Sequence, residues 1–229
     1  EGYALREEYD AILVGVRTIE ADDPRLQRHL GLNPNPHLLK AVLDSKLRIP
    51  AQALVCQRDP GDLVVFCCEG ASEERGRQLE ESGVTVVAVG PDSRGRCELR
   101  QVLRWLGSHG ISSLLGEGGG EVHWSFLHEG LTQQIHAFIA PLVLGGREAI
   151  SAVGGLGFAS PQDAVQHIAA STGIDPAELE TVPEEYTDVY KAMSPAMRAV
   201  YQSTVNDDEA LAILAEQKDL QDSRKFIQE

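Results

Sequence analysis

The sequence predicts an α/β protein in which a three-layer sheet, flanked by helices, is followed by an all-helical acidic extension. Up to about residue 160, apolar runs of strand length alternate with amphipathic segments of helical length, which is typical of parallel strands joined by helices. Beyond that point the strand-like runs stop. Acidic side chains outnumber basic ones by 21 to 15 in residues 1–159 and by 14 to 5 in residues 160–229, which supports a boundary there.

The strands of the first part are predicted from short runs that are apolar on both faces, as strands covered by helices are. Turn residues separate most of these runs from the helices that follow. The expected strands are residues 10–15, 38–44, 53–56, 62–68, 84–90, 111–117 and 131–146.

The helices are predicted from charged faces and from the glycines that end them. Residues 3–9 form a short amphipathic helix, and residues 18–26 form a helix or turn that Pro24 stops. Three further helices, each closed by glycine, are expected at residues 72–83, 98–110 and 121–130.

The extension is expected to begin with a helix, because Ser160 followed by Pro161 is a typical helix start and Gly173 a typical end. Further acidic helices are expected up to residue 229. The predicted organisation is therefore an α/β domain over residues 1–159 and a helical extension over residues 160–229.

The net charge of −15 argues against a nucleic-acid partner, because phosphate backbones require basic surfaces. No apolar run is long enough to cross a bilayer, and the first residues, EGYALREEYD, do not form a signal peptide. The cysteines and histidines have no spacing typical of metal ligands, so we expect no metal and reduced core thiols in a cytoplasmic protein.

The segment LLGEGGGEVHWSFL, residues 114–127, joins a predicted strand to a predicted helix through a glycine turn. The N–H groups and the dipole of a helix N-terminus favour an anion, so Gly118, Gly119 and Gly120 are candidates for binding phosphate. The segment lacks the last glycine of the dinucleotide-binding fingerprint, where Glu121 stands, and the lysine of a P-loop. Taken alone, it is equally compatible with a structural corner.

Glu117 lies at the carboxyl end of the same strand, where open α/β sheets bind their ligands. It is therefore a candidate catalytic carboxylate. A solvated glutamate in a turn is the alternative.

A second candidate group, GVRTIEADDPRL, follows the first predicted strand. Gly15 and Thr18 are candidates to face a cofactor, while Asp22 and Asp23 supply carboxylates for proton transfer or for binding hydroxyl groups. Asp23 before Pro24 equally indicates a plain turn.

A third group, VLDSKLRIP, also follows a predicted strand. Its Ser45 hydroxyl and Arg48 guanidinium are suited to a ribose 2′-phosphate.

Together these segments resemble a known family. LREEYDAILVGVRTIEADDPRL, AVLDSKLRIP, SLLGEGGGEVHWSFL and IHAFIAPLVLGG stand in the same order and spacing as in the bacterial riboflavin-biosynthesis reductase domain of the RibD C-terminal type. That domain is similar in fold to dihydrofolate reductase. The resemblance covers about residues 3–159, and the first strand of the family is missing from the residues that match.

The resemblance implies an NADPH-dependent, cytoplasmic and homodimeric reductase of 5-amino-6-(5-phosphoribosylamino)uracil, a phosphorylated pyrimidine. The ribosyl ring opens to an imine, and hydride reaches the sugar C1 to give the ribityl product. Asp22 and Glu117 would bind the substrate and move a proton during ring opening.

The resemblance also implies binding residues. Those for the substrate phosphate are Arg6, Leu26 and Arg28. Those for the cofactor are Gly15, Thr18, Ser45, Arg48, Gly118, Gly119 and Gly120, with the three consecutive glycines at the diphosphate and Ser45 and Arg48 toward the adenosine phosphate.

The alternative is a catalytically impaired nucleotide-binding or assembly protein whose helical extension is an interaction module. The presence of Asp22, Glu117 and the three glycines favours the enzyme. The missing first strand favours the alternative. So does the segment GLGFASPQDAV, which passes into the acidic helices where the family has its last strand.

Overall fold

The computed structural model describes residues 2–28, 31–33, 37–57, 59–136, 138 and 149–173. The chain divides into two compact units. One comprises residues 1–123 with 151–155, and the other comprises residues 124–150 with 156–229. The first unit contains the whole described sheet.

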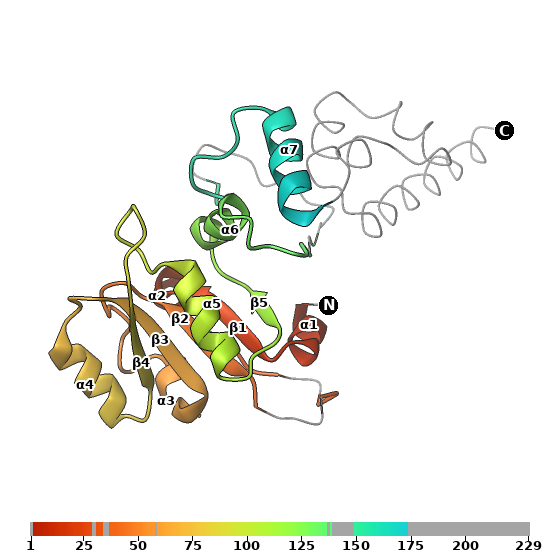
Figure 1. Ribbon diagram of the computed structural model, residues 1–229. Helices are drawn as coiled ribbons and strands as arrows, with labels where there is room; N and C mark the ends of the chain where they lie inside the picture. The colour runs from red at the N-terminus through yellow and green to blue at the C-terminus, as the bar shows by residue number, and fades with distance from the viewer. Residues whose placement is uncertain are drawn as a thin grey trace. The chain divides into compact units, whose positions relative to one another are not determined.

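The sheet of the first unit has five parallel strands in the spatial order β4-β3-β2-β1-β5 (Figure 1). The chain moves outward from β1 to β4 and then returns to the other side of β1, so the strand order reverses between β1 and β5. The strands are β1 Ala11–Gly15, β2 Leu39–Leu43, β3 Leu63–Cys68, β4 Thr85–Val89 and β5 Leu114–Gly116.

Helices connect the strands, as the alternating sequence pattern predicts. A short 3₁₀ helix, Pro60–Asp62, precedes β3. The α-helices are α1 Gly2–Glu8, α2 Val16–Asp22, α3 Leu54–Gln57, α4 Glu73–Glu81, α5 Leu99–Ser108, α6 Gly120–His128 and α7 Pro161–Thr172.

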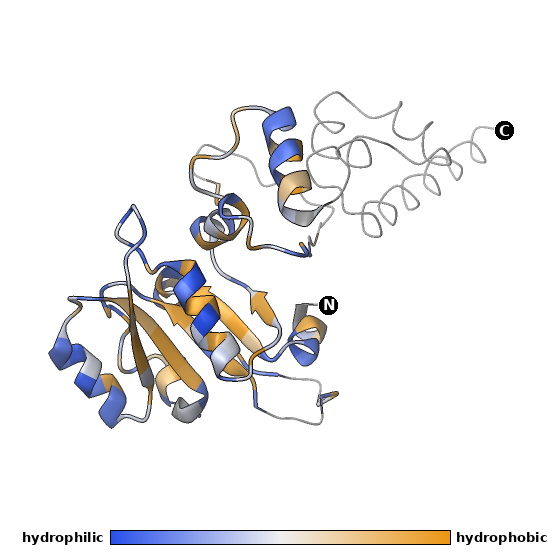
Figure 2. Cartoon of the chain, viewed as in Figure 1, coloured by the Kyte–Doolittle hydropathy of each residue, from blue (hydrophilic) through white to orange (hydrophobic). Residues whose placement is uncertain are grey.

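The core lies on both faces of the sheet, because alternate side chains of each strand point to opposite faces. On one face, Ile12 and Val65 belong to a cluster that includes Ile19 of α2, Val55 of α3 and Leu79 of α4. Helix α5 lies across the other face (Figure 1), where the rings of Phe66 and Trp105 meet edge to face at 5.4 Å. Figure 2 shows the same division, with apolar strands between helices whose outer sides are polar.

In the second unit, α7 packs against α6. The His167 ring nitrogen Nε2 lies 2.7 Å from the Leu127 carbonyl oxygen, and the rings of Trp124 and Phe158 lie 5.0 Å apart. Helix α7 begins and ends as predicted: the Ser160 hydroxyl accepts a hydrogen bond from the Asp163 amide at 3.1 Å, and Gly173 has the left-handed φ of 77°.

The predicted strand at residues 53–56 is wrong, because this segment forms helix α3. Its first turn is capped from a distance: the Leu54 amide donates to Asp23 Oδ1 at 2.8 Å. A run of four apolar residues does not distinguish a strand from a short helix. The other strands predicted before residue 118 are confirmed with shorter bounds.

The predicted strand at residues 131–146 is not seen in its described residues, 131–136 and 138, and the rest of it lies outside the described residues. The helices predicted after residue 173 also lie outside them. The predicted boundary at residue 160 stays a prediction.

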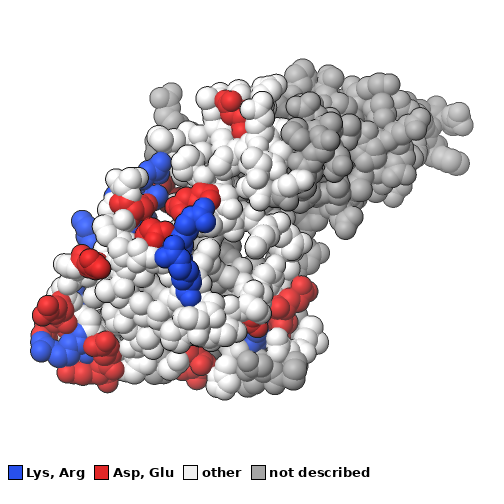
Figure 3. Space-filling view, in the orientation of Figure 1, with Lys and Arg blue, Asp and Glu red and all other residues white. Residues whose placement is uncertain are grey.

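No helix in the described part of the chain combines the length and apolarity that a membrane span requires. All four cysteines are buried and free, as expected for core thiols. On the face shown in Figure 3, the Lys and Arg residues lie beside Asp and Glu and do not form a continuous basic patch.

Candidate functional site

The candidate site lies where β1 and β5 end side by side. In parallel α/β sheets, ligands bind beyond the carboxyl ends of the strands, at the point where the strand order reverses. Gly15 ends β1, and Glu117 directly follows β5. The Glu117 amide donates to the Leu13 carbonyl at 2.9 Å, so the backbone of Glu117 is fixed by the sheet itself.

The glycine turn that follows offers hydrogen-bond donors at the start of α6. Within the described residues, no acceptor is recorded for the amide N–H groups of Gly118, Gly119 and Gly120. None of the three has a left-handed φ, so their backbone does not itself require glycine. A Cβ added to Gly119 would meet no atom of the described residues within 4 Å, which leaves room beside them for a ligand close to this backbone.

The other glycines of the turn are required by packing within the protein. Val122 of α6 lies against two of them: a Cβ on Gly118 would come within 2.7 Å of Val122 Cβ, and one on Gly15 within 3.1 Å of Val122 Cγ2. A Cβ on Gly120 would lie 2.7 Å from the Gly154 amide nitrogen. These residues bring α6 close to the end of β1.

Glu117 is joined to Arg6 of α1 by a bidentate ion pair. Arg6 Nε donates to Oε1 at 2.8 Å and Arg6 Nη2 donates to Oε2 at 2.6 Å. The Arg6 side chain is 13% exposed and that of Glu117 28%. The hydrogen bond to Glu117 raises the pKa of Arg6, so the guanidinium remains charged. The structure therefore brings together two of the predicted site residues.

The predicted phosphate-binding segment lies beside Arg6. Arg6 Nη1 lies 3.4 Å from the Gln27 carbonyl oxygen, and the buried residue before it, Leu26, has the left-handed φ of 48°. Arg28 donates from Nε to the Arg6 carbonyl at 3.0 Å and also donates to the carbonyls of Tyr9 and His37. The Arg28 guanidinium is thus hydrogen-bonded to backbone carbonyls, and its contact with a substrate phosphate stays a prediction.

The acidic pair after β1 divides into two different roles. Asp23 ends α2 in the left-handed conformation and caps α3, so the turn interpretation of Asp23 is correct. Asp22 is exposed at the end of α2, and no recorded hydrogen bond or ion pair within the described residues joins it to Glu117. Thr18 is half-buried on the first turn of α2. The catalytic role of Asp22 stays a prediction.

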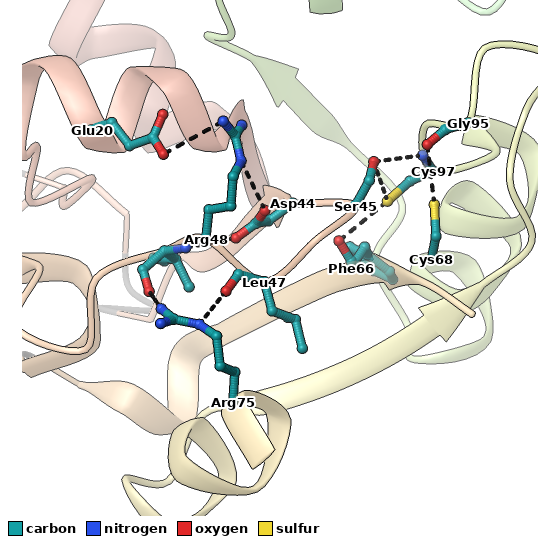
Figure 4. A network of polar contacts seen from close by, with 11 residues as sticks. Glu20, Asp44, Ser45, Leu47, Arg48, Phe66, Cys68, Arg75, Gly95 and Cys97 are labelled. Atoms are coloured by element: carbon teal, nitrogen blue, oxygen red, sulfur yellow. Dashed lines mark hydrogen bonds and ion pairs between the residues drawn. The ribbon is translucent and has the colours of Figure 1, made fainter. Parts of the chain in front are cut away.

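Ser45 and Arg48, the predicted pair after β2, do not point toward a common site. The Ser45 hydroxyl accepts a hydrogen bond from the Cys97 amide at 3.2 Å, while the Arg48 guanidinium points toward Glu20 of α2 (Figure 4). Asp44 lies between them, and its carboxylate Oδ2 accepts from the Ile49 amide at 2.7 Å.

Sequence reasoning missed two charged residues near this edge, Asp44 and Arg96. Asp44 is an acidic residue directly after a buried strand, the same signal that identified Glu117. The Arg96 guanidinium lies 3.0 Å from the Asp92 carboxylate and 3.6 Å from that of Glu121, the second residue of α6. Arg96 stands in a loop, and a basic residue there gives no comparable signal in the sequence.

The groups that could hold a cofactor lie at the glycine turn. No group of three or more potential ligand side chains is placed to hold a metal ion within the described ranges. The amide groups of Gly118–Gly120, the open space beside Gly119 and the start of α6 suit a diphosphate.

Known proteins are similar to this chain over most of its length. A reductase from Methanothermobacter thermautotrophicus, named as acting on 2,5-diamino-6-ribosylamino-4(3H)-pyrimidinone 5′-phosphate, is 36% identical over 165 residues, which are 72% of this chain and 74% of the relative. The riboflavin biosynthesis protein RibD of Bacillus amyloliquefaciens is 32% identical over 186 residues, which are 80% of this chain and 49% of RibD. The chain thus spans about half the length of that bacterial relative.

Solved structures share the fold. RibD of Acinetobacter baumannii matches with a TM-score of 0.52 at 22% identity, over 68% of this chain and 43% of that one. A pyrimidine reductase-like protein of Corynebacterium diphtheriae matches with a TM-score of 0.53 at 23% identity, over 67% of each chain.

The parallel sheet and the reversal of its strand order define an α/β protein of the dihydrofolate-reductase-like class, so the predicted α/β fold is confirmed. The predicted helical extension stays a prediction beyond residue 173. The profile of the RibD C-terminal domain matches residues 3–187, and the chain belongs to this family. Relatives from Methanothermobacter thermautotrophicus, Archaeoglobus fulgidus and Aquifex aeolicus all carry the name of the pyrimidinone phosphate reductase. They confirm the predictions of an oxidoreductase and of a reductase of riboflavin biosynthesis.

Proposed function

We propose that the chain is an NADPH-dependent reductase that converts the ribosyl group of a phosphorylated 6-ribosylaminopyrimidine to ribityl. The observation that carries this proposal is the bidentate Arg6–Glu117 pair, directly beside the glycine turn at the start of α6. The pair lies where the strand order reverses between β1 and β5. A carboxylate thus lies next to the glycine turn, which supports the proposal of a dinucleotide bound there.

The cofactor would be held mainly by backbone groups. The amides of Gly118, Gly119 and Gly120 would donate to its diphosphate, and the α6 dipole would favour the negative charge. Ser45, Arg48 and Thr18 would contact the adenosine side. When bound, NADPH supplies the hydride that reaches the sugar C1.

Glu117 is the group best placed to move a proton. Opening of the ribosyl ring transfers a proton from the amino nitrogen at C1 to the ring oxygen and leaves a C1–N imine. Reduction then adds hydride to C1 and a proton to nitrogen. A carboxylate fixed by the sheet on its backbone side and by Arg6 on its side-chain side can exchange such a proton without reorienting.

The substrate is one of two closely related pyrimidines. The reductase relatives are named for the diaminopyrimidinone phosphate, whereas the resemblance in sequence implies the aminouracil, which carries an oxygen in place of one amino group. Supplying each compound separately with NADPH and following the loss of NADPH absorbance identifies which of them is reduced.

The test of the catalytic residue is Glu117→Gln, which keeps the shape of the side chain and removes its charge. We expect kcat to fall roughly 10²- to 10⁴-fold, the contribution of a positioned acid–base group. Glu81→Gln, at an exposed residue of α4, is the matched control and should leave kcat unchanged. Equal kcat values for the wild type and the Glu117 variant would refute the proposed role.

Cofactor binding without turnover of either compound would favour the alternative, a nucleotide-binding protein without activity. Failure to bind NADPH at all would remove both functions. The homodimer, the cytoplasmic location and the lack of nucleic-acid or membrane partners stay predictions.

A further inference from the structure

The loop that follows β2, residues 44–49, presents one guanidinium to two carboxylates. Arg48 Nη1 lies 3.8 Å from Glu20 Oε1, and Arg48 Nε lies 3.9 Å from Asp44 Oδ1 (Figure 4). The Arg48 side chain is 48% exposed, so an anion from solvent can reach it. Neither distance is that of a close hydrogen bond, and the guanidinium retains donors for a further partner.

The two carboxylates differ in their freedom to move. The Asp44 side chain is completely buried and is held by the Ile49 amide. Its Oδ1 has no hydrogen-bond partner among the described residues, and burial raises the pKa of Asp44. Glu20 lies on α2 with a side chain that is 36% exposed, so it can turn into solvent.

The backbone of the loop is fixed from the other side. Arg75 of α4 donates to the carbonyls of Leu47 and Ile49, the latter at 2.9 Å. Leu47 is buried and has the left-handed φ of 53°, a conformation that persists only where the surroundings enforce it. Arg48 therefore projects from a rigid loop, and Glu20 is the flanking group that can yield to a ligand.

We propose that Glu20 is a specificity-determining residue, whose carboxylate competes with the 2′-phosphate of a dinucleotide for the Arg48 guanidinium. This inference rests on the proposed function. A phosphate monoester carries more negative charge than a carboxylate and forms stronger bidentate hydrogen bonds with arginine. It displaces Glu20, and the displacement lowers the affinity gained from the phosphate. Asp44 stays in place and positions Arg48.

The test compares four proteins: the wild type, Glu20→Gln, Arg48→Gln and the double variant. Isothermal titration gives the Kd of each for NADPH and NADH, and for adenosine 2′,5′-bisphosphate and adenosine 5′-monophosphate. Glu20→Gln should tighten binding of the two 2′-phosphorylated ligands roughly two- to fivefold, the range that a partly exposed ion pair contributes. Binding of NADH should not change.

The double variant shows whether the effect passes through Arg48. In the Arg48→Gln background, Glu20→Gln should no longer change the ratio of the NADPH and NADH affinities. Glu81→Gln, which removes an equal charge from α4, should leave all affinities unchanged, and thermal melts should show that every variant is folded.

The inference is refuted if Glu20→Gln leaves NADPH binding unchanged, changes NADH binding equally, or acts equally without Arg48. These outcomes leave the proposed function intact, because the wild type still binds NADPH. A wild-type protein that binds neither dinucleotide refutes the proposed function and this inference together.

Discussion

At the scale of single residues, the three consecutive glycines differ in what surrounds them. Gly118 and Gly120 allow other parts of the protein to approach, whereas Gly119 faces open space. Alanine substitutions at different glycines of the turn therefore test cofactor binding and folding stability separately.

Gly119→Ala should fold with unchanged stability but bind NADPH at least roughly tenfold more weakly, because the added methyl occupies the space proposed for the diphosphate. Fluorescence titration with NADPH and a urea unfolding curve measure the two effects. Unchanged affinity would show that the diphosphate does not approach Gly119.

Gly120→Ala is the contrasting variant. Its Cβ would lie 2.7 Å from the Gly154 nitrogen and 2.8 Å from the Ser151 carbonyl oxygen, both backbone atoms that cannot turn aside. We expect a loss of about 1–3 kcal/mol in the free energy of unfolding, as for other overpacked sites. The same urea experiment measures it.

The sequence identified Glu117 and the glycine turn because a strand end is a local signal. The sequence did not identify the partner of Glu117. Arg6 is separated from Glu117 by 111 residues, and its pairing depends on the position of α1 beside the sheet. Family resemblance assigned both residues to the substrate, but only the three-dimensional arrangement shows that they bind each other.

At the scale of elements, the sequence predicts short segments correctly where a glycine or a cap marks their ends. It predicts them wrongly where a residue distant in the sequence determines the conformation. Helix α3 shows the second case. Three of its four residues are apolar, as in a strand, and its first amide is capped by Asp23, 31 residues earlier. No pattern within residues 53–56 contains that information.

The hydrogen bonds between α4 and the loop after β2 make a measurable contribution to the free energy of unfolding. Arg75→Met leaves the carbonyls of Leu47 and Ile49 without this donor, and we expect a loss of about 1–3 kcal/mol in the free energy of unfolding. Arg77→Met is the matched control on the same helix. Among the described residues, Arg77 pairs with Glu74 alone, in an exposed i,i+3 contact, so its loss should cost about 0–1 kcal/mol. Equal losses in urea unfolding would contradict the linking role of Arg75.

At the scale of the whole sheet, the topology explains why the predicted groups fall where they do. The parallel strands place every strand end at one edge, and the reversal of strand order puts β5 beside β1. The sequence predicted the parallel sheet from its alternating elements. It did not predict the strand order, because order depends on which crossovers pack together over long separations.

The buried thiols give the sheet unit a dependence on alkaline pH. Burial raises the pKa of Cys97 from 9.0 to about 12 and that of Cys56 from 9.0 to about 11. Above pH 9 the unfolded chain therefore loses thiol protons that the folded protein keeps. The stabilising effect of these groups is complete below pH 9, falls as pH rises, and is fully lost above about pH 11 for Cys56 and about pH 12 for Cys97.

We expect the free energy of unfolding to fall by roughly 1.4 kcal/mol per pH unit for each such thiol within these ranges. Cys97→Ala isolates one of them. Because Cys97 Sγ donates to the Phe66 carbonyl at 3.2 Å, the variant should be less stable at neutral pH, yet its Tm should decline less steeply above pH 9 than that of the wild type. Circular dichroism melts in a reducing buffer from neutral pH to about pH 10.5 measure both slopes. Parallel declines for the two proteins would show that Cys97 titrates no differently in the folded and unfolded chains.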